Sequence, residues 1–450
     1  MLVRGSRRLV TILGLFFLST SFLGVLKFYN GWSLALPFWD GLSGQTVQPN
    51  RQPQSPLDGS TNSRPDDTYR EIFSVSTADK KYFLIKFGDQ EAMNPNIIPH
   101  PVLENTWIIV AQQIRRTVEH SVWCAELVCD AVFSNDTLVC VKSPLILPIA
   151  ATFGDRCQGD LAFLNLNVGP HDARVFYGPK MPYAVYGSNS AYTCFGQWMQ
   201  DFRMLVDWPF ESLPKLDFRM ATELQRPAPY GLVEKNWFVF WDRYDQMYAH
   251  YDIVPKRAFA KIGFDGSVGP DLAPLAASSD ERCTARYMPL VASKLESIHQ
   301  ATNSLSITLC KRSDSSCEVN DTNTFIFIIF QHKSFYSFHS VYGSYIMVIK
   351  PTAPFEIYGI SSKPIWIHGR GKPDGQGEFD AHDDHAIPKP INQSEMFYIT
   401  SMSWKAHGQK YHGYIDDVLF ISFGIEDSKT AGIDIVASDL FSDLGLCSAL

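Results

Sequence analysis

The sequence predicts an all-β domain that follows an N-terminal membrane span and a polar stalk. Three observations predict this organisation: an uncharged apolar run near the N-terminus, a segment without aromatic residues after it, and short β-branched and aromatic runs over the rest of the chain. The predicted parts are a cytosolic tail (1–8), a transmembrane signal anchor (9–28), a flexible stalk (29–74) and a lumenal domain (75–450).

The apolar run from Leu9 to Leu26 contains no charged residue. At ~1.5 Å per residue, a helix of this length spans the hydrocarbon core of a thin bilayer. Arg4, Arg7 and Arg8 precede the run and only Lys27 follows it, so we expect the tail in the cytosol and the later residues in the lumen. The alternative is a cleaved signal peptide, for which the sequence offers no clean cleavage site.

The segment from Gly41 to Asp67 is rich in Pro, Gly, Ser, Gln and Asn, and it buries too little apolar surface to fold by itself. The whole chain has 39 basic and 47 acidic residues, which gives a net charge of −8, and its basic residues form no run. A long-range electrostatic attraction to nucleic acid is therefore not expected.

Nine cysteines in a lumenal domain predict disulfides, with one cysteine left over. The close pairs Cys124/Cys129 and Cys310/Cys317 are candidates for short disulfide loops. Three Asn-x-Ser/Thr triplets, at Asn135, Asn320 and Asn392, are candidate N-glycosylation sites in this topology. These features are typical of a secretory-pathway protein, and we expect a Golgi or related membrane as its location.

Short runs with the composition of β-strands recur between clusters of Gly and Pro. The predicted strands are Trp107–Val110, Pro182–Tyr186, Trp237–Trp241, Thr324–Phe330, Tyr345–Ile349, Phe397–Trp404 and Val418–Phe423. The segment from Phe195 to Val206 also has helix-like spacing of its apolar residues, so helix and strand stay open there.

Many short strands without alternating helices are typical of a large sandwich, of tandem sandwiches or of a β-propeller. Aromatic-rich segments begin near residues 94, 170, 234, 324 and 397. Intervals of ~60 to 90 residues suit four-stranded blades with long loops. The sequence therefore predicts a five-bladed β-propeller.

Four short motifs occur in order along the domain: Asn94 to Pro99, Gly169 to Arg174, Glu234 to Trp237 and Ile421 to Asp427. Together the motifs resemble those of the five-bladed β-propeller carbohydrate enzymes, and most of all the β-mannoside phosphorylases and related β-mannosyltransferases. In that family an Asn-Pro opens the first blade and a Glu-Asp-Pro-Arg motif opens the second. The resemblance implies a glycan substrate and a site on the propeller axis.

Two residues depart from the family's second motif, because His171 replaces its Glu and Ala173 replaces its Pro. The resemblance therefore carries a catalytic role to Asp172 and a substrate-binding role to Arg174. Glycosyl transfer needs an acid at the leaving oxygen, and Asp172 is the predicted acid. Burial of its carboxyl favours the protonated form, whereas Arg174, on the same face of the strand, favours the ionised form. The alternative is a structural ion pair.

Six further residues are predicted to contact the substrate, from the resemblance or from their position before an apolar strand. They are Asn94, Glu234, Lys235, Asn236, His332 and Asp427. Side-chain amides donate and accept hydrogen bonds, which suits the hydroxyl groups of a sugar. Each of the six also fits a purely structural role.

The glycine-rich segment from Trp366 to His385 gathers several His and Asp residues, among them His368 and His382. Such loops are often only exposed and polar, and the spacing is not that of a regular metal site. No metal and no cofactor are therefore predicted. No Gly-rich phosphate loop is present either.

The predicted function is that of a secretory-membrane glycosyltransferase or glycoside-cleaving enzyme, phosphorolysis included, that acts on a mannose-type glycan. The alternative, favoured by the two departures at His171 and Ala173, is a non-catalytic glycan-binding or cell-wall scaffold propeller. Aromatic-rich channels bind sugars without cleaving them. The expected partners are a glycan and, through residues 9–28, the membrane.

Overall fold

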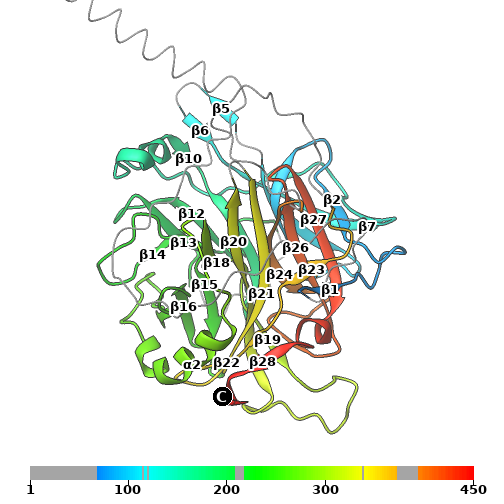
Figure 1. Cartoon of the computed structure of the whole chain (residues 1–450). Coiled ribbons are helices and arrows are strands. Elements are labelled where there is room, and N and C mark those ends of the chain that lie inside the picture. Colours follow the sequence, from blue (N-terminus) through cyan, green and yellow to red (C-terminus); the bar gives the residue numbers. More distant parts are fainter. Residues whose placement is uncertain are drawn as a thin grey trace, which may run out of the picture. The chain divides into compact units, whose positions relative to one another are not determined.

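The computed structural model describes residues 68–113, 116–118, 121–207, 217–336, 339–371 and 394–449 (Figure 1). Most of them lie in strands and in the turns between strands, which confirms the all-β class. The predicted tail, the predicted anchor and the stalk up to residue 67 lie outside the described residues. Among the described residues, no helix is both long and apolar enough to span a membrane.

All seven predicted strand runs are confirmed, and some strands are longer than predicted. The ambiguous segment after Phe195 is a strand, β13 (Phe195–Asp201), continued by the 3₁₀ helix η2 (Phe202–Met204). Strand is favoured there because β13 pairs with a strand on each side, which satisfies its backbone groups.

The strands form antiparallel groups that follow one another along the chain. The first group contains β3 (Ala92–Pro99), β4 (Trp107–Gln113), β7 (Glu126–Ser134) and β8 (Thr137–Cys140). The second contains β11 (His171–Tyr177), β12 (Pro182–Asn189), β13 and β14 (Thr222–Leu224). The third contains β15 (Phe238–Trp241), β16 (Met247–Asp252) and β17 (Ala258–Lys261).

The next group is built on the two longest strands, which run through the centre of Figure 1. They are β20 (Thr324–Tyr336) and β21 (His339–Ile349), joined by β18 (Glu296–Gln300), β19 (Leu305–Thr308) and β22 (Ile357–Ser361). Three short strands extend its edges: β23 (Ile365–Ile367), β25 (His412–Tyr414) and β28 (Leu444–Leu446). The helix α2 (Ala277–Tyr287), preceded by η3 (Ala273–Leu275), packs against β22.

The last group combines strands from both ends of the domain. It contains β24 (Phe397–Trp404), β26 (Val418–Ile425), β27 (Lys429–Val436) and, as its fourth strand, the early strand β2 (Phe83–Lys86). Because β2 also pairs in parallel with β8, it connects this group to the first one. The remaining short elements are β5 (Arg116–Val118), β6 (Ser121–Trp123), β9 (Leu145–Ile146), β10 (Asn167–Val168), η1 (Gly159–Leu166), η4 (Ala437–Leu440) and η5 (Cys447–Ala449).

The all-β unit starts earlier than predicted, since β1 (Arg70–Ile72) falls inside the predicted stalk. This strand pairs in parallel with β23, and the Ile72 side chain is buried. Arg70 forms an ion pair with Asp443. These contacts come from residues about 300 or more positions away in the chain, so the local composition did not reveal the strand.

Buried polar side chains fasten the first and second groups to their neighbours. Asn96 of β3 bonds to β11: its Nδ2 donates to the Ala173 oxygen (2.8 Å) and its Oδ1 accepts from the Val175 nitrogen (3.0 Å). Gln197 of β13 accepts a hydrogen bond from the Trp237 nitrogen (3.1 Å), at the start of β15. At each of these two boundaries between groups, hydrogen bonds of a side-chain amide take the place of backbone hydrogen bonds between strands.

The other boundaries are fastened in the same way. The Ser304 hydroxyl donates to the Val239 oxygen of β15 (2.7 Å). The Asn303 amide bonds to both backbone groups of Met402 in β24 (3.0 Å each), and the Thr400 hydroxyl of β24 donates to the Pro95 oxygen of β3 (2.5 Å). The bonds return to β3, where they began, so the groups close into a ring. The number of blades stays a prediction.

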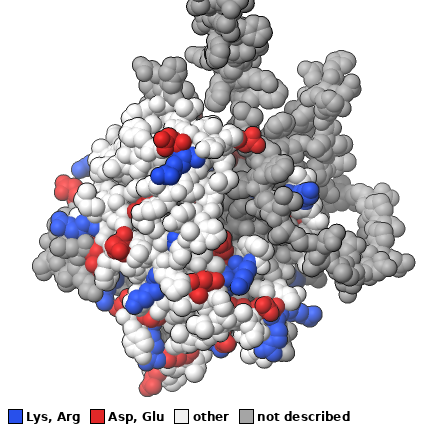
Figure 2. All heavy atoms as spheres, turned by 90° about the vertical axis from the view of Figure 1, so that its left-hand side faces the viewer, with Lys and Arg blue, Asp and Glu red and all other residues white. Residues whose placement is uncertain are grey.

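The core is continuous across the sheet that contains β20, because this strand is buried on both faces. Phe325, Phe327 and Ile329 pack into one apolar cluster, and the alternate residues Ile326 and Ile328 pack into another. An uninterrupted apolar run is the expected sequence of a strand that is covered on both sides. On the face shown in Figure 2, acidic and basic side chains are interspersed and gather into no large patch of one sign.

Four disulfides are present, which indicates folding in an oxidising compartment: Cys129–Cys140, Cys157–Cys194, Cys283–Cys447 and Cys310–Cys317. The predicted Cys310/Cys317 pair is confirmed. The predicted Cys124/Cys129 pair is wrong, because Cys129 bonds to Cys140 across β7 and β8 and Cys124 takes part in none of the four disulfides. An extended chain puts two cysteines five residues apart too far from each other for a disulfide.

Candidate functional site

Asn94 and Asp172 lie near the starts of β3 and β11, two strands that lie beside each other. Both residues have a positive φ, 54° and 50°, and the pairing register shifts at both positions. A bulge with a left-handed residue turns a side chain out of the alternation of its strand. Here the two side chains meet, and Nδ2 of Asn94 donates a 2.8 Å hydrogen bond to Oδ1 of Asp172.

Arg174 joins this pair to two other elements. Its Nη1 donates to the backbone oxygen of Asp172 (2.5 Å) and its Nε donates to the backbone oxygen of Ala301 (3.1 Å). Its Nη2 donates to the hydroxyl of Tyr398 in β24 (3.0 Å). Burial raises the pKa of Tyr398, and the positive charge of Arg174 opposes this shift. The guanidinium therefore fixes a neutral phenol beside the bulge.

Two buried side chains hold the backbone of the bulge from the first group. Gln112 of β4 accepts a hydrogen bond from the Asp172 nitrogen (2.9 Å), and Glu126 of β7 accepts one from the Ala173 nitrogen (3.2 Å). The pKa of Glu126 is raised to about 8, mainly by burial; the hydrogen bond from Ala173 and the charge of Arg174 lower it, and the charge of Asp172 raises it. Glu126 is therefore largely protonated at neutral pH.

Asp172 has the opposite shift. Burial raises its pKa, but the charges of Lys235, Arg174 and His171 and the hydrogen bond from Asn94 together bring the pKa below its usual value. The prediction that burial keeps Asp172 protonated near neutral pH is therefore wrong. The sequence predicted that burial would raise the pKa of Asp172 and that Arg174 would lower it. Several cations act on the carboxyl together, and their effect is larger than that of burial.

Lys235 and Lys333 bring further positive charge to the cluster, and of the two lysines Lys235 acts on Asp172. Lys235 precedes β15 and Lys333 lies on β20, and the charge of Lys235 lowers the pKa of Asp172 as well as that of Lys333. Burial is the larger cause of the Lys333 shift, and Asp427 opposes it. Burial and both lysines also lower the pKa of His299 to about 4. The cluster thus contains three cations, of which Arg174 and Lys235 act on the Asp172 carboxylate and Lys333 interacts with Lys235 and Asp427.

Asp427 completes this arrangement from the turn between β26 and β27, where its φ is 48°. Its charge raises the pKa of Tyr398 and of Tyr342, in both cases after the larger effect of burial. The predicted residues Asn94, Asp172, Arg174, Lys235 and Asp427 therefore belong to one electrostatic cluster. Asn236 follows Lys235 with a φ of 62°, and its backbone oxygen accepts a hydrogen bond from Gln300 (3.3 Å).

Comparisons with known proteins find similar folds only at low identity. No family model matches the chain, and no curated protein matches it. Solved structures align over most of the chain. β-1,2-mannobiose phosphorylase from Listeria innocua is 8% identical over 83% of this chain and 96% of its own, with a TM-score of 0.41. The mannosyltransferase from Leishmania mexicana that depends on GDP-Man is 10% identical over 79% and 89%, with a TM-score of 0.35.

A third similar structure is the arabinanase Arb43A from Bacillus subtilis, which is 8% identical over 77% of this chain and 95% of its own, with a TM-score of 0.35. TM-scores below 0.5 do not assign this chain to a family.

Two of the predicted substrate contacts lie elsewhere. Glu234 forms an ion pair with Arg226 (2.7 Å) and accepts a hydrogen bond from the Gly231 nitrogen, so it fixes its own loop. His332 lies on β20 next to Lys333, and successive strand residues point to opposite faces. Its Nε2 is 3.5 Å from Glu296 on the face away from Lys333. For both residues the structural role is the one observed.

Three members of the cluster were not predicted: Glu126, Lys333 and Tyr398. Glu126 opens β7, which also carries Asp130; Glu126 is buried and Asp130 is exposed, a difference that the sequence alone does not mark. Tyr398 lies in the predicted strand Phe397–Trp404, whereas Lys333 lies beyond the end of the predicted strand Thr324–Phe330. Neither residue carries a local signal. Their role depends on strands that meet only in the folded chain.

The predicted His- and Asp-rich loop is described only up to residue 371, so His382 and His385 lie outside the described residues. Nδ1 of His368 is 2.7 Å from Oε1 of Glu71. Among the residues that the structure describes, no group of three or more His, Cys, Asp or Glu side chains has the arrangement of a metal site.

Proposed function

We propose that the chain is a secretory-membrane glycosyltransferase or glycoside-cleaving enzyme that acts on a mannose-type glycan on a five-bladed propeller. The observation that carries the proposal is the Asp172 carboxylate, held by Asn94 at the meeting of two inner strands and surrounded by cations. A carboxylate positioned by an amide, beside a neutral phenol and a guanidinium, has the groups that acid–base chemistry on a sugar hydroxyl requires.

The cations of the cluster favour a sugar that carries a phosphate. Arg174, Lys235 and Lys333 give the cluster three cationic side chains beside the carboxyls of Asp172 and Asp427. Phosphate and diphosphate groups are the anions that such clusters bind. These cationic groups favour transfer from a phosphorylated sugar, or phosphorolysis as its reverse, over simple hydrolysis.

The lowered pKa of Asp172 gives the residue a role in each direction of that reaction. In the transfer direction the carboxylate accepts the proton of the acceptor hydroxyl while the bond from the anomeric carbon to the phosphate oxygen breaks and the new glycosidic bond forms. In the reverse direction the same carboxyl returns the proton to the glycosidic oxygen as phosphate bonds to the anomeric carbon. A bound phosphate screens Lys235 and Arg174, which raises the pKa of Asp172 toward that of an acid.

The test uses the full-length chain with two reactions, β-mannobiose with inorganic phosphate and a mannose acceptor with GDP-mannose. Asp172→Asn is expected to lower turnover by about 10²- to 10⁴-fold, the usual size of an acid–base contribution, with little change in melting temperature. Asp89→Asn, at an exposed turn, is the matched control. Full activity of Asp172→Asn removes the proposed role. Tight glycan binding with no product from either reaction favours the non-catalytic scaffold.

The location of the enzyme is part of the proposal. We expect a type II protein of the Golgi membrane, anchored by residues 9–28, and the four disulfides support an oxidising compartment for its β-unit. In sealed microsomes the domain is then protected from added protease until detergent opens the membrane. Digestion before detergent contradicts this topology.

A further inference from the structure

A groove of about 1190 Å³ lies apart from the Asp172 cluster, and none of the predicted site residues lines it. Its walls come from the loops that follow β11, β15, β19 and β24, and they include Trp241, Arg312, Tyr411, Tyr414 and Asp417. Pockets of ~300–1,000 Å³ hold ligands of several rings, so this groove has room for a short oligosaccharide.

Both arginines that line the groove are paired with carboxylates of the groove. Arg312 binds Asp417 through two bonds, from Nε (2.8 Å) and from Nη2 (2.6 Å), and Arg243 forms an ion pair with Asp321. An anion that binds either arginine would compete with its carboxylate partner. The lining therefore suits a neutral ligand.

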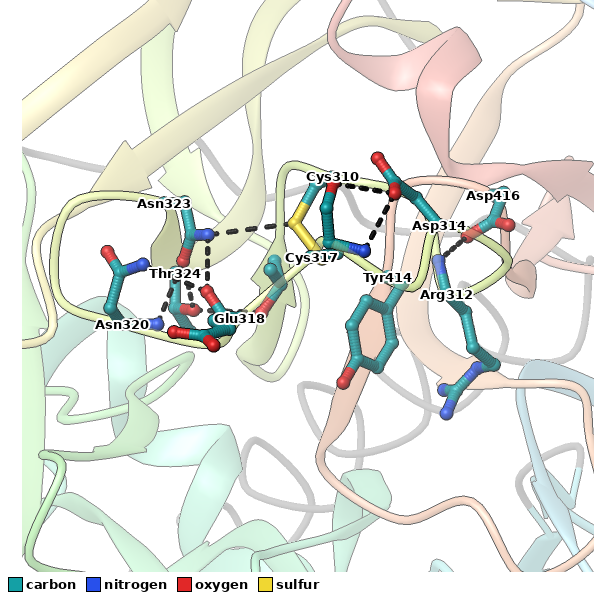
Figure 3. The surroundings of a disulfide bond; sticks show 12 residues. Cys310, Arg312, Asp314, Cys317, Glu318, Asn320, Asn323, Thr324, Tyr414 and Asp416 are labelled. Carbon is teal, nitrogen blue, oxygen red and sulfur yellow. Dashed lines mark hydrogen bonds between the residues drawn. A yellow bond between two sulfur atoms is a disulfide. The ribbon is translucent and has the colours of Figure 1, made fainter.

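Tyr414 gives the groove a partly apolar wall with polar edges. The Arg312 guanidinium lies over the Tyr414 ring at 4.3 Å (Figure 3). Within the described part of the chain, the Tyr414 hydroxyl and Nη1 of Arg312 form no hydrogen bond. A ring face next to unused donors matches a sugar, which has apolar C–H faces and hydroxyl groups at its edges.

Asn320 stands on the wall of the same groove, and it begins the triplet Asn320-Asp321-Thr322. The residue is exposed and lies on the segment between β19 and β20, shortly after the loop that the Cys310–Cys317 disulfide closes (Figure 3). Its Nδ2 donates to the Glu318 oxygen (2.9 Å) and its Oδ1 accepts from the Thr322 hydroxyl (2.6 Å). A glycosylated amide keeps one N–H, so it can still donate to Glu318.

We propose that Asn320 carries an N-linked glycan whose first sugar rings lie in this groove against Tyr414. In the attachment step, the Asn320 amide nitrogen bonds to the anomeric carbon of an oligosaccharide delivered as a lipid diphosphate; the lipid diphosphate leaves and the nitrogen loses one proton. The covalent link then keeps the sugar at a high effective concentration beside the groove. This inference does not depend on any activity of Asp172.

The experiment maps the glycans of the full-length chain, produced in a eukaryotic secretory pathway, by mass spectrometry. Thr322→Ala is expected to remove one glycan, and Thr137→Ala, at the start of β8 directly after the exposed turn, is the matched variant for the Asn135 triplet. The rate at which peptide N-glycosidase releases each glycan from the native protein is then measured in the wild type and in Tyr414→Ala.

Loss of the Tyr414 ring is expected to speed release from Asn320 by about tenfold or more, because the sugar rings then spend less time in the groove, where the glycosidase cannot reach them. Release from Asn135 is expected to stay unchanged. Tyr414→Phe keeps the ring and is expected to behave like the wild type. Tyr244→Ala is the control. Like Tyr414, Tyr244 has an arginine over its ring (Arg243, at 4.9 Å), but Tyr244 itself does not line the groove. An unmodified Asn320, or equal release rates from Asn320 in the wild type and Tyr414→Ala, overturns the proposal.

Discussion

Asp172 and Glu126 show how two nearby carboxyls acquire opposite protonation states from their surroundings. Cations and the Asn94 amide lower the pKa of Asp172, whereas burial raises that of Glu126 to about 8. Pairs of titratable groups with pKa values shifted apart are typical of sites for proton transfer. Glu126 is fully buried, so we assign it a positioning role, through its bond to the Ala173 nitrogen, and leave contact with substrate to Asp172.

Glu126→Gln is expected to stabilise the folded protein at neutral and alkaline pH. The folded pKa of about 8 lies above the ordinary value of 4.5, so Glu126 destabilises the fold progressively as the pH rises from 4.5 to 8. At pH 7 the cost is about 3 kcal/mol, and near pH 4 it is absent. Glutamine stays neutral and keeps the acceptor for the Ala173 nitrogen.

Urea unfolding at pH 5 and pH 8 measures this difference. The variant is expected to gain little stability at pH 5 and about 4 kcal/mol at pH 8. An identical pH dependence in wild type and variant contradicts the raised pKa. Glu281→Gln, on the exposed face of α2, controls for the loss of one carboxylate charge.

At the residue scale, the sequence predicted members of the cluster where a local motif marks them. Asn94, Asp172 and Arg174 meet because two bulges, each at a positive-φ residue, aim them at one point. The sign of the Asp172 shift was not predictable, because it depends on Lys235, which is 63 positions away in the chain. Glu234 and Lys235 were both predicted as substrate contacts. Lys235 acts on Asp172, whereas Glu234 pairs with Arg226.

At the scale of elements, strand existence was predictable and strand extent was not. The apolar part of β20 was predicted as Thr324–Phe330, but the strand continues to Tyr336 through polar residues. Pairing with β18 and β21 along its whole length supports this extension. A polar continuation has no period that marks it as strand, so only the neighbouring strands decide its conformation.

The disulfides are expected to differ in what they contribute to stability. Cys283–Cys447 joins α2 to the C-terminal segment over a separation of 164 residues, whereas Cys310–Cys317 spans 7. In the chain-entropy account, the longer loop restricts the unfolded state more, by about 3 kcal/mol. The double variant Cys283→Ala/Cys447→Ala should therefore unfold at a clearly lower temperature than Cys310→Ala/Cys317→Ala. Equal melting temperatures would contradict this account.

At the scale of the molecule, ring closure brings together residues from the two ends of the β-unit. Strand β2 pairs with β27, and buried amides and hydroxyls fasten each group to the next until the bonds return to β3. The recurrence of aromatic segments predicted repeated units. It could not predict which strand closes the ring, because β2 is four residues long and carries no pattern of its own.

Gly432 lies at this closure, paired with Phe83 from the other end of the unit. A Cβ at Gly432 would lie 2.9 Å from the buried Phe83 ring and 3.1 Å from Ile97. Alanine in a strand is otherwise better than glycine, so Gly432→Ala tests packing at the closure. We expect a loss of about 1–3 kcal/mol, the usual cost of overpacking.

Thermal unfolding followed by circular dichroism measures this loss, and the matched variant is Gly269→Ala, whose Cβ would meet only the Lys261 oxygen at 3.6 Å. That variant is expected to be neutral or slightly more stable, by about 0.5 kcal/mol, because it restricts the unfolded chain. If β2 and β27 belong to one cooperative ring, Gly432→Ala lowers the temperature of a single transition. A separate early transition, with the main one unchanged, would mean that β2 detaches by itself and that the remaining groups do not need the closure to stay folded.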